Sequence, residues 1–117
     1  MAAPRGPVAA RLRQQQHALL RRFRLPAELT EMLPGSLSLS HLRCGKPTCH
    51  CATGDGHPVW HLTYRVQGRT RVLHIPAAWV EAIRRQVEAG RAVQDAVREV
   101  LAANAELLQL ARRQRRR

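Results

Sequence analysis

Apolar residues recur at helical spacing in the first part of the chain. They predict a helix over residues 8–24, which ends before Pro26, and a second short helix over residues 27–33. The apolar residues that share one face of the first helix are Val8, Leu12, Leu19, Leu20 and Phe23. Residues 1–7 precede this pattern and are expected to form a disordered arm.

The pattern then changes to the alternation that is typical of β-strands. Strands are predicted over residues 36–43, 59–66 and 69–75, and Gln67-Gly68 provides a hairpin turn between the last two. Together they predict a three-stranded antiparallel sheet, with a cysteine-rich loop inserted between the first and second strands. The side chains expected to point inward are Leu37, Leu39, Trp60, Leu62, Tyr64, Val66, Leu73 and Ile75.

A heptad pattern predicts a long helix over residues 77–111, either continuous or broken or bent near Gly90. Residues 77–90 are expected to pack on the protein's own sheet. For residues 93–111, packing within the chain and pairing as a coiled coil with a second copy or another protein both remain open. The predicted fold class is therefore α+β: an N-terminal helix, a three-stranded antiparallel sheet with an inserted loop, and a long C-terminal helix.

Length and composition favour one small domain over residues 8–111. The chain has 117 residues, of which 44% are apolar and only 3% aromatic. The core is therefore expected to be small and aliphatic, and a bound metal would add stability that such a core lacks. No apolar run has the length of a membrane span or of a secretory signal, which favours a cytoplasmic protein with reduced thiols.

The net charge of +12 is concentrated at the two ends of the chain. Residues 1–24 contain six arginines and no acidic residue, and the tail of residues 112–117 contains five arginines, whereas the middle is nearly neutral. Basic arms of this kind suit the phosphate backbone of nucleic acid. Two alternative explanations of the arginine excess are that basic tails aid solubility and that a GC-rich genome favours arginine codons. The candidate nucleic-acid-binding residues in these arms are Arg11, Arg13, Arg21, Arg22, Arg24, Arg112, Arg113, Arg115, Arg116 and Arg117. Arg65, Arg69 and Arg71 are expected to extend this surface from the outward face of the hairpin.

The three cysteines of the chain lie within eight residues, in the loop of residues 43–58. The spacing Cys44-x4-Cys49-x-Cys51-x5-His57 predicts a structural zinc site, because tetrahedral zinc accepts three thiolates and one imidazole. His41, His50 and His61 are alternatives to His57 as the fourth ligand. The competing interpretations are free buried thiols, redox-active or regulatory thiols, and a catalytic cysteine. The loop contains one acidic residue, which argues against a zinc or thiol hydrolase and favours a protein that is not an enzyme.

The stretch "RCGKPTCHCATGDGHPVWHLTY" resembles a family of small, largely uncharacterised bacterial proteins with a CGKP-x-C-x-C…H signature. The resemblance covers roughly residues 36–110 and includes Gly68, Thr70, Arg71, Ile75 and Pro76 of the following strand. Members of that family often occur beside transposases and other mobile-element genes. The resemblance therefore implies a role with mobile DNA but no mechanism.

These observations lead to two functional hypotheses. The first is a small protein with a structural zinc ion that binds nucleic acid, with DNA as the expected type, through its arginine-rich arms as an accessory of a mobile element. The second is an adaptor or oligomerisation protein, which pairs through residues 93–111 with itself or with a recombinase-like partner.

Overall fold

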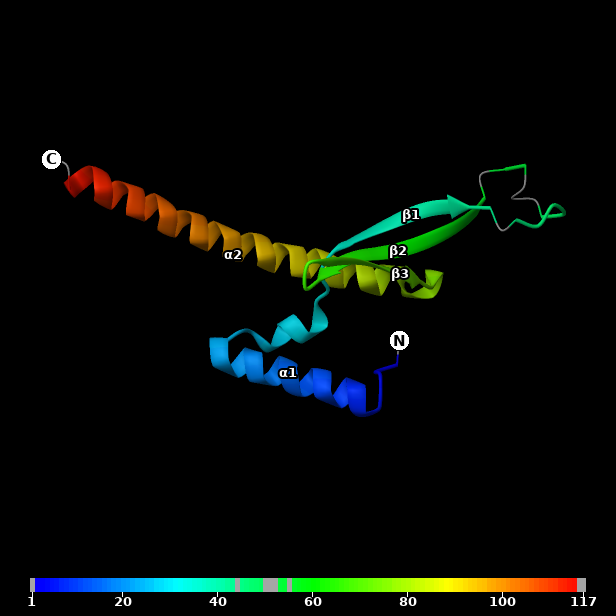
Figure 1. Ribbon diagram of the computed structural model, residues 1–117, viewed down its shortest axis with the longest axis horizontal. Helices are drawn as coiled ribbons and strands as arrows, with labels where there is room; N and C mark the ends of the chain where they lie inside the picture. The colour runs from blue at the N-terminus through cyan, green and yellow to red at the C-terminus, as the bar shows by residue number, and fades with distance from the viewer. Residues whose placement is uncertain (1, 44, 50–52, 55, 116–117) are drawn as a thin grey trace.

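The computed structural model describes residues 2–43, 45–49, 53–54 and 56–115. The predicted α+β fold is confirmed, since a helix, a three-stranded sheet and a long helix follow one another along the chain (Figure 1). In chain order the elements are α1 (Pro7–Phe23), the 3-10 helix η1 (Ala27–Glu31), β1 (Ser36–Leu42), β2 (His57–Val66), β3 (Arg69–Ile75), the 3-10 helix η3 (Ala77–Trp79) and α2 (Val80–Arg115).

The three strands form an antiparallel sheet in the order β1-β2-β3. β2 begins at His57, two residues earlier than predicted, and this residue pairs with Leu42 at the end of β1. The cysteine loop therefore leaves one end of the sheet, between paired strand ends. At the other end Gln67 and Gly68 join β2 to β3, both with positive φ, as a two-residue hairpin turn of type I′ requires.

One face of the sheet carries the core. The beginning of α2 lies along this face, and the side chains buried there are those of Leu62, Ile75, Val80, Ile83 and Val87. Leu73 lies opposite Leu62 in the register and so belongs to the same face, yet it is half exposed, because β3 is an edge strand. The core is as small and aliphatic as the composition predicts, with Trp60 and Tyr64 packed partly buried at its margin.

Helix α2 is continuous through Gly90, which decides between the continuous and the broken helix that the sequence left open. Gly90 is buried where the chain entering β1 crosses the helix. The backbone N–H of Leu33 donates a hydrogen bond of 3.0 Å to the carbonyl of Gln86, and a Cβ on Gly90 would overlap the Leu33 carbonyl oxygen. The absence of a side chain at Gly90 therefore permits close packing of two backbones.

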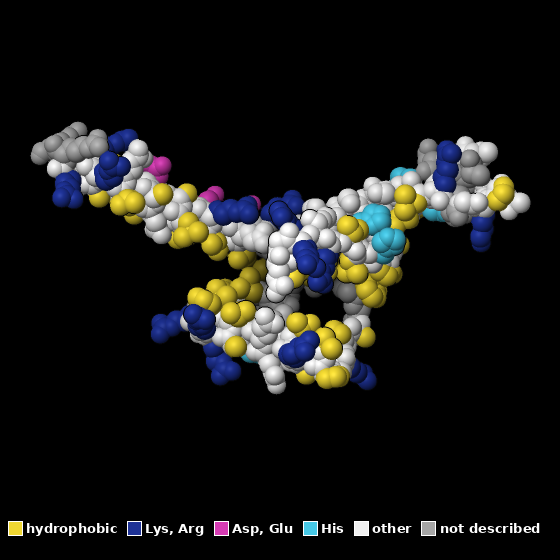
Figure 2. Space-filling view, in the orientation of Figure 1, with side chains coloured by type: hydrophobic (Ala, Val, Ile, Leu, Met, Phe, Trp, Pro, Cys, Tyr) yellow, Lys and Arg dark blue, Asp and Glu magenta, His cyan; other side chains and the backbone are white. Residues whose placement is uncertain are grey.

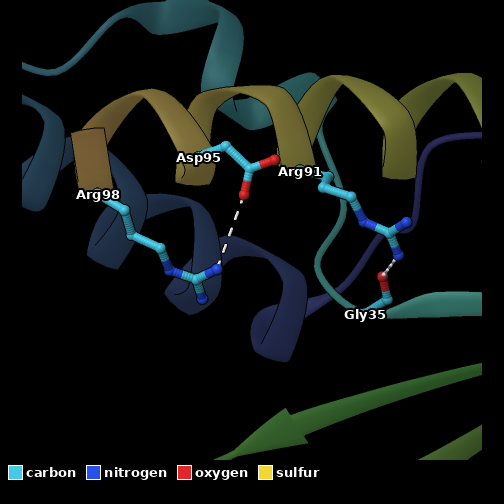
Figure 3. A network of polar contacts seen from close by, with 4 residues as sticks. All are labelled: Gly35, Arg91, Asp95 and Arg98. Atoms are coloured by element: carbon cyan, nitrogen blue, oxygen red, sulfur yellow. Dashed lines mark hydrogen bonds and ion pairs between the residues drawn. The ribbon is translucent and has the colours of Figure 1, made fainter.

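A second contact fixes the same crossing. The Arg91 guanidinium donates a hydrogen bond of 3.5 Å to the carbonyl of Gly35 (Figure 3). Gly35 has φ +93°, and a Cβ there would overlap the backbone oxygen of Thr63 in β2. The segment that precedes β1 is thus held between α2 on one side and the central strand on the other.

Both helices extend beyond the core. The second half of α2 projects away from the sheet, and α1 lies to one side of α2 (Figure 1). The molecule consequently measures 77 × 38 × 24 Å. Within the described part of the chain, α1 has no buried residue, and no helix is long and apolar enough to cross a membrane.

Candidate metal centre and arginine surfaces

Two of the four predicted zinc ligands lie side by side. The Sγ atom of Cys49 is 3.3 Å from Nε2 of His57, and both side chains are partly buried. Cys49 comes from the loop and His57 from the first position of β2. The turn that carries Cys49 is closed by a hydrogen bond of 3.1 Å from its backbone N–H to the carbonyl of Lys46.

This geometry fits a metal with sulfur and nitrogen ligands. A Zn–S bond of about 2.3 Å and a Zn–N bond of about 2.0 Å place neighbouring ligand atoms of a tetrahedral site about 3.5 Å apart. The 3.3 Å between Cys49 Sγ and His57 Nε2 is close to that value. At the same distance a thiol and an imidazole also form a hydrogen bond, so the pair alone suits either arrangement.

The other predicted ligands, Cys44 and Cys51, lie outside the described residues, as does His50. Among the residues that the structure does describe, no group of three metal-ligating side chains is assembled. A complete four-ligand site therefore stays a prediction from the sequence.

The alternative histidines occupy different places in the sheet. His41 lies opposite Pro58 and so faces the side of the sheet that α2 covers. His61 lies on the other face, where its ring meets that of His74 edge-on with centroids 4.7 Å apart. Of the three candidate histidines that the structure describes, His57 is the one that lies beside Cys49.

The base of the loop is closely packed. Gly56 has φ +88°, and a Cβ there would come within 2.9 Å of the Leu42 backbone. Arg43 donates a hydrogen bond of 3.3 Å to the carbonyl of Gly54. These contacts bring the two ends of the loop together directly beside the Cys49–His57 pair, so the fold positions at least half of the predicted ligand set.

Helix α1 presents a concentrated positive charge. Its arginines are Arg11, Arg13, Arg21 and Arg22, with Arg24 just beyond its end, and all five are exposed. The first acidic residue of the chain is Glu28, and in the described structure none of these arginines forms an ion pair. Arg13 instead donates to the carbonyl of Pro4, and Arg22 lies over the ring of Phe23. No ion pair among the described residues therefore compensates their charge.

The hairpin arginines do not share one face, contrary to the expectation. Arg71 lies opposite Tyr64, and Arg69 lies opposite Val66, so both belong to the face on which α2 packs. Arg65 belongs to the opposite face and bonds to the carbonyl of Gly68 at 3.2 Å. The cause is the two-residue period of a strand, which puts Arg69 and Arg71 on the same side as Leu73.

The arginine groups are spread over the molecule rather than gathered in one patch (Figure 2). Arg112, Arg113 and Arg115 are exposed in the last turn of α2, far from the sheet, while Arg116 and Arg117 lie outside the described residues. The arginines of α1 form a separate group beside α2 (Figure 2). A single ligand that touches both groups must therefore be extended, as a nucleic-acid strand is.

Comparison with known proteins gives a family for this fold. The domain of unknown function DUF6788 matches residues 10–85, which run from α1 through the loop and the sheet into the first turns of α2. The chain belongs to the DUF6788 family. The matched region of this DUF6788 protein ends before the projecting half of α2. No curated protein and no solved structure matches the chain.

Sequence reasoning missed one feature of this DUF6788 protein, which is the composition of the open sheet face. Ser38, His61 and His74 lie in one row across the three strands there. The Nδ1 atom of His61 is buried and has no hydrogen-bond partner among the described residues. The two-residue period of a strand was a sufficient signal to place these residues on the face opposite the core.

Proposed function

We propose that this DUF6788 protein is a small protein with a structural zinc ion that binds nucleic acid through the arginines at its two ends. The observation that carries the proposal is the uncompensated charge of α1, a helix with exposed arginines and no acidic residue. Arginines of this kind bind phosphate backbones mainly by releasing condensed counterions. The extended separation of the α1 and tail groups supports a long polyanion as the ligand rather than a compact one.

The zinc ion has a structural role in this proposal. Cys49 and His57 would hold it together with Cys44 and Cys51 at the junction of loop and sheet. Bound zinc would supply a covalent-like cross-link between the loop and β2, and so stabilise a fold whose core is small. We also assign the protein to mobile-element biology as an accessory, on the strength of the resemblance carried by its cysteine signature.

Binding of a duplex DNA without a chosen sequence tests the proposal. Fluorescence anisotropy over a range of salt concentrations should show that log K falls steeply with log salt. The double variant Arg21→Gln with Arg22→Gln should reduce that slope by about 1.8, since each phosphate contact contributes about 0.9.

The matched control removes two charges from α2 instead. Arg85→Gln with Arg98→Gln changes the net charge equally, but Arg98 already forms an ion pair with Asp95 at 3.7 Å. This control should leave the slope nearly unchanged. Binding that does not depend on salt, or equal effects of both double variants, would contradict a specific role of α1.

A second candidate function is that of an adaptor or oligomerisation protein with a recombinase-like partner. The observation that favours it is the row of exposed apolar side chains on the projecting half of α2. Under this function the arginines would serve solubility or the choice of partner. Retention of DNA binding after removal of the recombinase-like partner would favour the first candidate.

A further inference from the structure

The chain exposes far more surface than a monomer of its mass. A folded monomeric protein of this size is expected to expose about 6,400 Å². The structure exposes 10188 Å², and its radius of gyration is 20.9 Å, where a compact domain of the same length has about 13 Å. The excess of on the order of 3,800 Å² falls within the range that obligate homodimers bury.

The excess includes an apolar stripe on α2. Val93, Val97, Val100, Asn104, Leu107 and Ala111 recur three and four residues apart, and Leu101 and Leu108 lie beside them on the same side of the helix. The leucines and Val100 are about 60–66% exposed, although their side chains are large and apolar. The period of a helix puts Asp95, Glu99 and Glu106 on its opposite side. The helix is therefore amphipathic, and its apolar side is uncovered in the single chain.

Helix α1 shows the same imbalance. Val8, Leu12, Leu19 and Phe23 lie on one side of α1, and each is 44–58% exposed. Figure 2 shows apolar side chains of α1 and of α2 bordering the same open region between the two helices. Two helices that each leave an apolar side open toward one space form half of a helical bundle.

We infer that the occupant of this space is a second copy of the chain, paired in parallel and in register through the stripe on α2. The width of the stripe suits a bundle that contains more than two helices, because a two-stranded coiled coil needs only a narrow seam. A second copy brings one further α2 and one further α1, which completes four helices.

Asn104 decides the direction of pairing. It lies in the middle of an otherwise apolar stripe. In a parallel dimer in register its amide meets the partner's Asn104, and the two amides can hydrogen-bond each other. In an antiparallel pair centred on the stripe it would face Val100 or Leu101 instead, and a buried amide would have no partner. Parallel pairing is thus the arrangement that satisfies this residue.

Parallel pairing has an electrostatic consequence. It places the two arginine tails, each with Arg112, Arg113 and Arg115 in the last turn of α2, side by side at one end of the dimer. The positive charges of the two tails repel each other. Added salt screens this repulsion, so salt should tighten the dimer. The dimer itself does not depend on the proposed nucleic-acid function. If that function holds, one phosphate backbone would bind both tails and relieve their repulsion.

Sedimentation equilibrium of the full chain, with and without added salt, tests the inference. The expected particle has twice the 13.2 kDa mass of the chain. Leu108→Glu should abolish the dimer, because it puts a charge in the stripe. Gln109→Glu introduces the same charge one residue away, off the stripe, and should leave the dimer intact. If Leu108→Glu is unfolded while Gln109→Glu is a folded dimer, the inference also holds, since a side chain that is 66% exposed in the single chain would then be essential.

Deletion of residues 112–117 tests the direction of pairing. In the parallel dimer it removes the repulsion between tails and should tighten association at low salt, whereas at high salt the effect should vanish. A wild-type chain that is monomeric would overturn the inference and favour a different protein as the occupant. Three other results would overturn it as well. The dimer could survive Leu108→Glu, it could be lost in Gln109→Glu to the same extent as in Leu108→Glu, or its affinity at low salt could be unchanged by deletion of the tail. Any of these results would leave nucleic-acid binding by α1 untouched.

Discussion

The carbonyl oxygen of Leu33 lies against the Cα atom of Gly90, where any side chain would overlap it. The adjoining hydrogen bond from the Leu33 N–H to Gln86 anchors the chain that leads into β1 directly to α2. This contact links the N-terminal part of the molecule to the core, against which the Leu33 side chain also packs. It also gives a substitution whose effect should be opposite in sign to the usual one.

We expect Gly90→Ala to destabilise the protein by about 1–3 kcal/mol, because the added methyl group forces two backbones apart. At an ordinary helix position the same change would add about 1 kcal/mol of stability. Urea unfolding measures the difference. Ala92→Gly, two residues away on an exposed part of the helix, calibrates helix propensity alone. An increase in stability for Gly90→Ala equal to the loss for Ala92→Gly would show that the close contact is absent in solution.

We expect purified protein to contain one zinc ion per chain and to lose thermal stability when a strong chelator removes it. Metal analysis combined with thermal unfolding measures both quantities. The physical reason is that ligands from the loop and from β2 are brought together only in the folded chain, so that binding energy becomes folding energy.

The histidine ligand can be identified with two matched variants. His57→Ala should lower zinc content and make the melting temperature insensitive to chelator, because His57 lies 3.3 Å from Cys49. His41→Ala removes an imidazole from the other face of the sheet, so this variant should retain zinc. Stoichiometric zinc in His57→Ala, together with its loss in His41→Ala, would assign the fourth ligand to the other histidine.

We expect deletion of residues 112–117 to weaken binding to duplex DNA and to reduce the slope of log K against log salt by up to about 4.5. Five arginines are removed, and each can neutralise one phosphate. Anisotropy titrations at two salt concentrations suffice for the measurement. Replacement of the tail by a neutral sequence of equal length controls for length. If DNA affinity is unchanged both after the deletion and after the neutral replacement, the tail has another role.

The strands could be predicted closely from the sequence, because alternation reports directly on a half-buried strand. β3 has the predicted bounds, and residues 69–75 needed no tertiary information. The same period would have placed Arg69 and Arg71 on the face of Leu73, so that error was avoidable. Helix α2 was predicted as a whole for a similar reason, since its heptad pattern extends over many turns.

Features that depend on contacts between distant segments could not be predicted. Gly90 looks like a helix breaker in the sequence, and only the passage of Leu33 across the helix explains it. The proximity of Cys49 and His57 is different, because it could be expected from the sequence: their short spacing, with turn residues between them, limits how far apart the two side chains can lie. The uncovered sides of α1 and α2 were partly visible as periodic patterns, but their exposure required the structure.

The position of the cysteine loop between β1 and β2 has a consequence for the order in which the sheet assembles. β2 and β3 are joined by two residues, so their hairpin can form within about 1–10 µs. β1 can join only after residues 43–56 have closed on themselves, and the entropy lost in closure grows with the length of a loop. An ion held between Cys49 and His57 would bring Leu42 to its partner before the rest of β1 has paired. The loop would then act on the folding rate of the sheet, and metal supply would set how long the nascent chain keeps an unpaired strand edge.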